Sequence, residues 1–342
     1  MKAAMYYGPK DVRIEDIPMP EPGPGEILMK IKAATTCGTD VKTYMRGYAK
    51  DTGEPRIFGH EAAGIVEAVG EGVTKFKVGD RIVPHNTYPC GHCYWCKRSQ
   101  PSMCENFAGR GGTFCGYTVL PKRLIELNTF LIPDNIDFAS AAMVEPLSCA
   151  VYGVDEANIQ LNDIVVINGA GPLGLYMVKI ASMRGGRVIC CDLSEDRLKV
   201  AKKLGAWQTV HVTEGMDQVQ AVRDLTPNNR GADVVIEAVG LPEVWEMALG
   251  MVRKGGLVEW FGGCKAGAKV TVDTTLMHYG QLTLKGIFHT TPLHVEMAFN
   301  MIANGDIKGE DFIGKEYPLE ECIEAIESHA RKEAIKNVIV FD

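Results

Sequence analysis

A group of cysteines in the first half of the chain has the spacing of a metal site. Cys90, Cys93, Cys96 and Cys104 follow the pattern C-x2-C-x2-C-x7-C and are four of the 11 cysteines in the chain. Four thiolates can converge on one tetrahedral zinc ion, which leaves no coordination position open for a substrate. The ion would also supply folding energy that a loop with little apolar core lacks. The pattern therefore predicts a structural zinc site, with His92 and Cys115 as nearby spare ligands.

A second set of candidate ligands is spread more widely. Cys37 lies in TTCGTD, His60 and Glu61 lie in FGHEAAG, and Glu145 lies in MVEPL. A thiolate, an imidazole and a carboxylate suit zinc, and three protein ligands leave a fourth position for water or substrate. Taken singly, each has a plainer explanation: a small buried thiol, a hydrogen-bonded polar side chain, or a helix cap. The spacing alone does not decide between these alternatives.

The middle of the chain carries a dinucleotide signature. An apolar run at Ile164–Asn168 leads directly into the glycine-rich turn GAGPLG and then into a helical pattern. Glycines there permit a tight turn and a close approach of the backbone to a pyrophosphate. A second apolar run ends at Asp192, whose carboxylate can accept hydrogen bonds from the ribose hydroxyls and would repel a 2′-phosphate, so NAD is favoured over NADP. The alternative is a tight strand–helix turn, with Asp192 as a helix cap.

The candidate cofactor-binding residues lie in and after this signature. They are Gly169, Gly171, Pro172, Leu173, Gly174, Asp192, Arg197 and Val239.

Composition and charge point to small-molecule chemistry. The chain has 36 Lys and Arg against 43 Asp and Glu, a formal charge of −7, and no basic cluster. Binding to nucleic acid or to an anionic membrane is therefore not expected. The first residues lack the apolar core of a signal peptide, and the most apolar long stretch is interrupted by Asn168 and Lys179, so we expect a cytoplasmic protein. In that reducing compartment, clustered cysteines hold metal more often than they form disulfides.

The pattern of apolar runs and turn residues changes near residues 150 and 285. A chain of 342 residues is long enough for about two domains. Before residue 150, short alternating runs such as EILMKIKAA lie among Pro/Gly turns, which favours a β-rich domain. From Asn162 onward, apolar runs of strand length alternate with helical stretches, which is typical of an α/β unit with a parallel sheet and helices on both faces. After residue 285 we expect helices at Val295–Ala303 and Leu319–His329 and a last strand at Asn337–Phe341.

Several motifs together carry a resemblance to a known family. GHEAAGIVEAVGEGV, VGDRIV, the four-cysteine run and GAGPLG resemble the zinc-dependent medium-chain dehydrogenase family over essentially the whole chain. CGTD, GHE and the pair Glu145-Pro146 are most similar to its polyol (sorbitol) and threonine dehydrogenase branch. The resemblance implies a GroES-like catalytic domain at 1–149 and 286–342. It also implies a doubly wound Rossmann domain at 150–285, with a six-stranded parallel sheet.

The resemblance also implies roles for single residues. Cys37, His60 and Glu61 match the ligands of a catalytic zinc, and Glu145 matches a glutamate that either ligates the metal or approaches it through water. Thr39 matches a hydroxyl that passes on the substrate proton. Asp40 is either a partner that orients the ring of His60 or an ordinary surface residue.

Two departures from the family pattern leave the substrate open. Where polyol and threonine enzymes commonly have a histidine that continues the proton relay, this chain has Lys42, which is charged at neutral pH unless strongly perturbed. Where the polyol branch tends to have an arginine after a GxF motif, this chain has His289, a candidate for contact with the substrate or a packed loop residue.

The expected activity is the oxidation of a secondary alcohol or polyol to a ketone, with hydride transfer to NAD. The expected cofactors are NAD and two zinc ions per chain, one catalytic and one structural, in a homodimer or homotetramer. A threonine 3-dehydrogenase-like or diol dehydrogenase activity is the closest alternative. From other classes, a non-redox lyase or epimerase that retains NAD, or a silent nucleotide-binding relative, stays open.

Overall fold

The computed structural model describes residues 1–47 and 53–342. The chain divides into two compact units, one formed by Met1–Ser148 with Thr290–Asp342 and the other by Cys149–His289. The first unit is therefore built from both ends of the chain. No helix within the described residues is long and apolar enough to cross a membrane.

The first unit is rich in β-structure, as the alternating runs predict. Its main sheet has seven strands in the order β10-β6-β5-β3-β18-β17, with β9 also paired to β3. These strands are β3 (Ile27–Thr35), β5 (Glu61–Val69), β6 (Arg81–Pro84), β9 (Tyr117–Leu120), β10 (Thr129–Leu131), β17 (Ile313–Pro318) and β18 (Lys336–Val340). β3 and β5 are largely buried and supply Ile27, Met29, Ile31 and Val66 to the core. Burial of these side chains stabilises the sheet that later positions the site.

Smaller elements complete the first unit. A three-stranded sheet has the order β2-β1-β4, and β7 pairs with β8. These strands are β1 (Lys2–Gly8), β2 (Asp11–Asp16), β4 (Arg56–Ile57), β7 (Thr87–Tyr88) and β8 (Ala108–Gly109). The helices are α1 (Gly38–Arg46), α2 (Lys122–Asn128), α3 (Phe138–Ala142), α10 (Pro292–Ala303) and α11 (Cys322–Ala330), and α4 (Val144–Glu156) begins here. The two C-terminal helices and the last strand thus lie within a few residues of their predicted positions.

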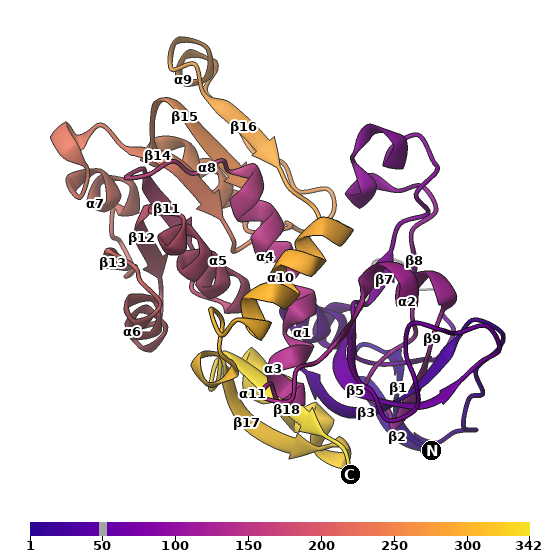
Figure 1. Ribbon diagram of the computed structural model, residues 1–342. Helices are drawn as coiled ribbons and strands as arrows, with labels where there is room; N and C mark the ends of the chain where they lie inside the picture. The colour runs from indigo at the N-terminus through magenta and orange to yellow at the C-terminus, as the bar shows by residue number, and fades with distance from the viewer. Residues whose placement is uncertain (48–52) are drawn as a thin grey trace. The chain divides into compact units, whose positions relative to one another are not determined.

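The C-terminal strand β18 joins the main sheet between β3 and β17. It runs antiparallel to β3, with Val338 opposite Thr35 and Ile339 opposite Ala34. On its other side, β3 pairs antiparallel with β5, and Thr35 lies opposite Glu61. Segments about 300 residues apart are therefore neighbours in one sheet (Figure 1).

The second unit contains the predicted six-stranded parallel sheet, in the order β13-β12-β11-β14-β15-β16. Its strands are β11 (Ile164–Asn168), β12 (Arg187–Asp192), β13 (Gln208–His211), β14 (Ala232–Glu237), β15 (Val252–Trp260) and β16 (Thr283–Gly286). The order reverses between β11 and β14, which is the switch point where doubly wound sheets bind dinucleotides. The predicted doubly wound fold is therefore confirmed.

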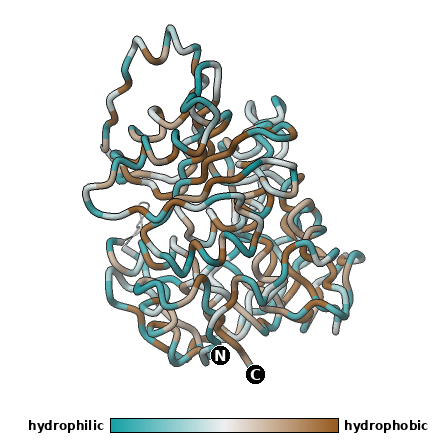
Figure 2. Tube along the Cα trace, turned by 90° about the vertical axis from the view of Figure 1, so that its left-hand side faces the viewer, coloured by the Kyte–Doolittle hydropathy of each residue, from teal (hydrophilic) through white to brown (hydrophobic). Residues whose placement is uncertain are grey.

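Helices cover both faces of this sheet, because right-handed crossovers on the two sides of β11 place them on opposite faces. α5 (Pro172–Met183) and α6 (Glu195–Lys203) pack together on one face, while α7 (Gln218–Asp224) and α8 (Pro242–Met251) pack together on the other. The central strand β11 is buried throughout. Coloured by hydropathy, the chain trace shows brown, apolar stretches alternating with teal, hydrophilic ones (Figure 2).

Candidate metal and cofactor sites

Cys37, His60 and Glu61 come together in the first unit. One potential ligand atom from each lies within 4.8 Å of the others. Cys37 is the N-cap of α1, and His60 and Glu61 lie at the start of β5. Because β3 brings α1 next to β5, residues that are distant in the sequence meet at one end of the main sheet. The structure therefore assembles a mixed sulfur, nitrogen and oxygen set from residues that the sequence could only suggest one by one.

Asp40 organises two members of this set. Its Oδ1 lies 2.9 Å from Nδ1 of His60, and its Oδ2 accepts a hydrogen bond of 2.9 Å from the backbone N–H of Cys37. Asp40 is buried, which excludes the alternative that it is an ordinary surface residue. Because Nδ1 of His60 faces Asp40, Nε2 is the ring atom that faces Oε1 of Glu61, 3.9 Å away. This arrangement is the usual way in which a ligand histidine is oriented.

Glu61 shows which of its oxygens could bind a cation. Its side chain is fully buried, and Oε2 accepts hydrogen bonds from the hydroxyl of Thr35 and from Lys336. Oε1 is buried and has no hydrogen-bond partner among the residues that the structure describes. A buried carboxylate oxygen left in this way is costly unless a donor or a cation meets it. The donor types, their spacing and this unpaired oxygen together fit a zinc ion.

Lys336 was not singled out by sequence reasoning. It is fully buried at the start of β18, with Nζ 2.7 Å from Oε2 of Glu61 and 2.8 Å from the carbonyl oxygen of Thr36. Burial lowers the pKa of Lys336, but the attraction of Glu61 outweighs burial and raises it overall. In the sequence, Lys336 stands directly before the run NVIV, and this position does not indicate which residue it contacts.

Glu145 lies near this set but is not part of it. Its oxygens are outside the group of atoms within 4.8 Å, and Oε1 accepts a hydrogen bond of 2.7 Å from the side-chain amide of Asn86. Burial raises the pKa of Glu145 to about 7, although the neighbouring His60 opposes that shift.

Arg110 also contributes to the region, and no motif in the sequence pointed to it. Its guanidinium donates hydrogen bonds to the carbonyl oxygens of His60 (3.0 Å) and His85 (3.3 Å). Burial lowers the pKa of Arg110 to about 10. The contacts tie the segment that carries the candidate ligands to the loop that carries Asn86.

Electrostatics around His60 are dominated by its acidic neighbours. Burial opposes the protonated imidazole, but Asp40 and Cys37 outweigh burial and raise the pKa of His60 well above its ordinary value.

Thr39 lies in the first turn of α1 with its side chain exposed, and Lys42 is exposed one turn later.

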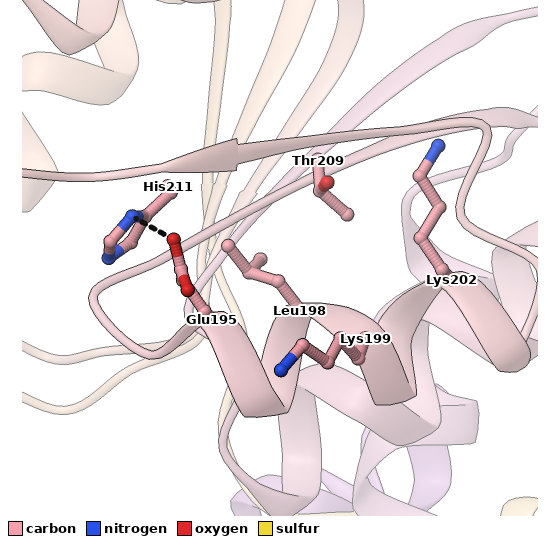
Figure 3. A pocket seen from close by; sticks show the side chains of 6 residues that line it. All are labelled: Glu195, Leu198, Lys199, Lys202, Thr209 and His211. Carbon is pink, nitrogen blue, oxygen red and sulfur yellow. Dashed lines mark ion pairs between the residues drawn. The ribbon is translucent and has the colours of Figure 1, made fainter.

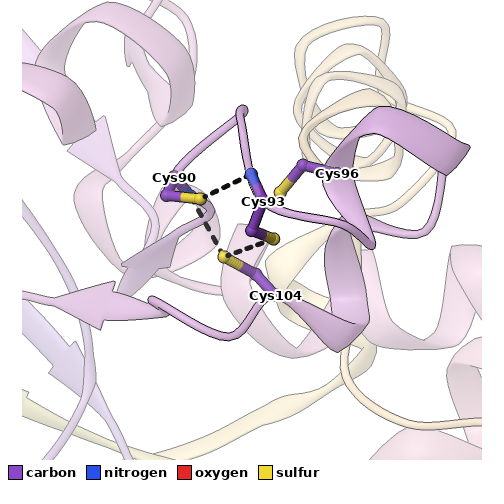
Figure 4. A group of neighbouring side chains, drawn as sticks. All are labelled: Cys90, Cys93, Cys96 and Cys104. Carbon is purple, nitrogen blue, oxygen red and sulfur yellow. Dashed lines mark hydrogen bonds between the residues drawn. The ribbon is translucent and has the colours of Figure 1, made fainter.

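The four clustered cysteines also meet. The sulfur atoms of Cys90, Cys93, Cys96 and Cys104 lie within 4.8 Å of one another (Figure 4). Backbone N–H groups point at the sulfurs, from Cys93 to Cys90 (3.3 Å) and from Cys90 to Cys104 (3.2 Å). Hydrogen bonds from the backbone of His92 and Cys93 lower the pKa of Cys90 to about 6, while burial raises that of Cys96 to about 12.

Around these cysteines the loop has only a small apolar cluster of Trp95, Phe107 and the thiols themselves. The candidate spare ligands, Cys115 and His92, lie outside the group of four sulfurs. Four converging thiols with so little core around them fit a closed tetrahedral zinc site.

At the other candidate site, the glycine-rich turn follows β11 at the carboxyl edge of the parallel sheet. Gly169 has φ +102°, which disfavours any residue with a side chain. A Cβ on Gly174 would lie 1.8 Å from the carbonyl oxygen of Gly169, whereas a Cβ on Gly171 would meet nothing within 4 Å. Gly169 and Gly174 are thus required by the backbone of the turn. Gly171 leaves open space at the N-terminus of α5, where a pyrophosphate would bind.

Asp192, at the end of β12, is held by the same turn. Its Oδ2 accepts a hydrogen bond of 2.6 Å from the backbone N–H of Ala170, and its Oδ1 accepts one of 2.8 Å from Ser194. Arg197 lies in the first turn of α6, where burial lowers its pKa and Asp192 opposes that shift. Val239 follows β14, and its side chain lies against Gly169. These candidates therefore share one edge of the sheet.

His289 is the last residue of the second unit and is half-buried. Its φ of +66° is the left-handed conformation, which is uncommon for a residue with a side chain. Such strain often marks a functional position.

A hollow of about 360 Å³ lies between α6 and the edge strand β13 (Figure 3). It is lined by Glu195, Leu198, Lys199, Lys202, Thr209 and His211. Nδ1 of His211 lies 3.2 Å from Oε1 of Glu195, and the two lysines are largely exposed. The lining includes neither the glycine-rich turn nor Asp192, so the hollow is not the cofactor site.

Comparison with known proteins agrees with both halves of this description. Residues 23–129 match the alcohol dehydrogenase GroES-like domain, and residues 172–304 match the zinc-binding dehydrogenase domain. The chain is 31% identical to a sorbitol dehydrogenase from Bacillus subtilis, over 96% of this chain and 93% of that protein. It is 33% identical to an erythritol/L-threitol dehydrogenase from Mycolicibacterium smegmatis, over 98% and 96% of the two chains.

Among solved structures, it is similar to a zinc-binding dehydrogenase from Sinorhizobium meliloti that is bound to NADP. The two chains are 28% identical, with a TM-score of 0.91 and 99% of each chain covered. Sequence motifs, fold and near-complete coverage lead to one conclusion: the chain belongs to the zinc-dependent medium-chain dehydrogenase family.

Proposed function

We propose that the protein oxidises a secondary alcohol or polyol to the ketone and transfers the hydride to NAD. The observation that carries the proposal is the convergence of Cys37, His60 and Glu61, with one buried oxygen of Glu61 left for a cation. The named activities of the sorbitol and erythritol/L-threitol relatives support a substrate with several hydroxyl groups.

In this proposal, Cys37, His60 and Glu61 hold a catalytic zinc ion in the first unit. When bound, zinc supplies Lewis acidity that favours loss of the hydroxyl proton of an alcohol. Asp40 keeps Nε2 of His60 directed at the site, and Lys336 occupies the far oxygen of Glu61. The exposed hydroxyl of Thr39 receives the substrate proton and passes it to solvent. Glu145 either completes the ligand set or holds a water beside it.

The second unit binds the cofactor. The pyrophosphate lies at the turn from Gly169 to Gly174, and the adenosine ribose lies at Asp192. The fixed carboxylate of Asp192 favours the ribose hydroxyls of NAD and repels the extra phosphate of NADP. Arg197 and Val239 contact the two halves of the cofactor, and His289 contacts substrate hydroxyls.

The four clustered cysteines bind a second zinc ion that stabilises their loop and takes no part in the reaction, because four thiolates leave no open position. We further infer a homodimer or homotetramer, because the resemblance to the polyol branch implies one of these two states.

The proposal is tested by mixing the full-length protein with NAD and a panel of alcohols and following the ultraviolet absorbance of NADH. The panel contains inositols, pentitols, hexitols, threonine and butanediol. Oxidation of one or more polyols is expected, with NADP much less effective. Threonine or butanediol as the only substrate would favour the neighbouring branches. No net reduction of NAD with any of them would favour a non-redox enzyme or a silent relative.

A further inference from the structure

We propose that Lys336 is a positioning residue for the candidate catalytic metal site, so that metal binding depends on the C-terminal strand. The inference rests on the proposed function only in taking Cys37, His60 and Glu61 as metal ligands. Lys336 itself touches neither substrate nor metal in this proposal. It acts through one oxygen of Glu61.

The first step of the argument is the division of labour between the two oxygens of Glu61. Oε2 accepts from Nζ of Lys336 at 2.7 Å and from the hydroxyl of Thr35. Within the described part of the chain, Oε1 has no hydrogen-bond partner, and it is the oxygen that faces Nε2 of His60. Two donors on one side thus fix the carboxylate and turn the other oxygen toward the ligand set.

The second step is that Lys336 is itself held in place. Its Nζ also donates to the carbonyl oxygen of Thr36 at 2.8 Å. The next residue, Asn337, donates its backbone N–H to the hydroxyl of Thr36 and accepts from the backbone N–H of Thr36. Thr36 directly precedes Cys37, so the same contacts fix the strand end that carries the thiol. The C-terminal strand therefore braces two of the three candidate ligands.

The third step concerns charge. Lys336, Glu61, Thr35 and Thr36 are all fully buried, so their interactions are little screened by water. A lysine so close to a metal site would repel the cation, whereas its hold on Glu61 favours a correctly placed ligand. Residues that orient metal ligands commonly change metal affinity by about 10- to 100-fold, and we infer that positioning outweighs repulsion here.

The experiment measures zinc affinity of the full-length protein by competition with a chromophoric chelator. Wild type is compared with K336M, which keeps the apolar stem but removes the ammonium, and with K336R, which restores a cation. C37S gives the baseline for zinc held elsewhere in the chain. V338A is the matched control, because Val338 is fully buried on the same strand but contacts no candidate ligand through a polar group.

If the inference holds, K336M binds the C37S-sensitive zinc about 10- to 100-fold more weakly, K336R recovers part of that loss, and V338A keeps wild-type affinity. Unchanged or tighter zinc binding by K336M would overturn it. If wild type held no more zinc than C37S, the proposed metal site itself would be wrong.

Because K336M leaves Glu61 without its cation and could fold poorly, K336Q is measured as well, since its side-chain amide can still donate a hydrogen bond to Oε2 of Glu61. Zinc affinity and unfolding temperature are measured for K336M, K336R and K336Q. Zinc affinity that follows the unfolding temperature across these variants and V338A alike would overturn the positioning role and leave a purely structural one.

Discussion

Oδ2 of Asp192 accepts a hydrogen bond of 2.6 Å from the backbone N–H of Ala170, so the end of β12 is fastened to the glycine-rich turn after β11. The other oxygen of Asp192 accepts from Ser194 at the start of α6. Asp192 therefore both shapes the turn and presents its negative charge where the ribose is expected.

This double role predicts how cofactor preference changes. In the variant D192S/L193R, an arginine replaces an exposed leucine and the repelling carboxylate is lost. The ratio of kcat/KM for NAD over NADP should fall by about 100-fold, from roughly tenfold for each change. Because the serine side chain is shorter, the turn should also loosen and NAD binding should weaken. L193R alone is the control, and it should shift the ratio less. An unchanged ratio in the double variant would mean that Asp192 does not face the ribose.

Asp40 provides a second test, because it bonds both Nδ1 of His60 and the backbone of Cys37. D40N keeps the shape but loses the charge that orients the imidazole, so zinc affinity or kcat should fall about 10- to 100-fold. D80N is the matched control, since Asp80 accepts a similar backbone hydrogen bond from Lys77 at an exposed position. Metal content and kcat are measured for both variants. Equal effects of D40N and D80N would contradict the assignment.

We expect changes in the four-cysteine loop to lower the stability of the protein without affecting its catalysis. C93S/C96S should lose one zinc equivalent and unfold at a lower temperature, because metal binding contributes folding energy to the loop. Protein that stays folded should keep its KM for alcohol and for NAD. C115S is the control and should retain both zinc equivalents, because Cys115 lies outside the group of sulfurs. A double variant that stayed folded with all its zinc but lost turnover would make this loop the reactive centre.

The buried carboxyl group of Glu259 should make the stability of the second unit depend on pH. Glu259 is fully buried in β15, and neither carboxylate oxygen has a hydrogen-bond partner among the described residues. Burial raises its pKa to about 8. The neighbouring Lys285 opposes that shift and Glu156 adds to it. Because the folded pKa lies above the unfolded value of 4.5, the folded protein holds a proton that the unfolded chain releases.

The contribution of Glu259 is therefore fully present below about pH 4.5, falls as the pH rises toward 8, and is constant above that. The total change is about 5 kcal/mol, at about 1.4 kcal/mol per unit. E259Q lacks this proton, so its stability relative to wild type should rise across the same window. Unfolding midpoints from pH 5 to 9 measure the effect, with E214Q, at an exposed position of the second unit, as the control. Parallel pH profiles for E259Q and wild type would rule out a buried, protonated Glu259.

Much of the fold was readable from local patterns. The apolar runs after Asn162 predicted a parallel sheet covered by helices on both faces, because its central strand β11 is buried on both faces. The number of six strands was implied by the family resemblance. The glycine-rich turn could be predicted for a similar reason. Gly169 and Gly174 are required by backbone conformation and close contacts within a few residues of the turn. The spacing of the four cysteines likewise indicated a metal site, because all of them lie in one short loop.

The catalytic candidate was decided only by the tertiary structure. Sequence motifs suggested Cys37, His60 and Glu61 one at a time, but only the pairing of β3 with β5 brings their ligand atoms within 4.8 Å. Glu145 looked like an equal member of the set, and its hydrogen bond to Asn86 distinguishes it from the other three. Lys336 could not be predicted at all, because its partner lies on a strand about 275 positions earlier. Local residue order fixes which elements form, whereas the meeting of buried charges depends on sheet register between distant segments.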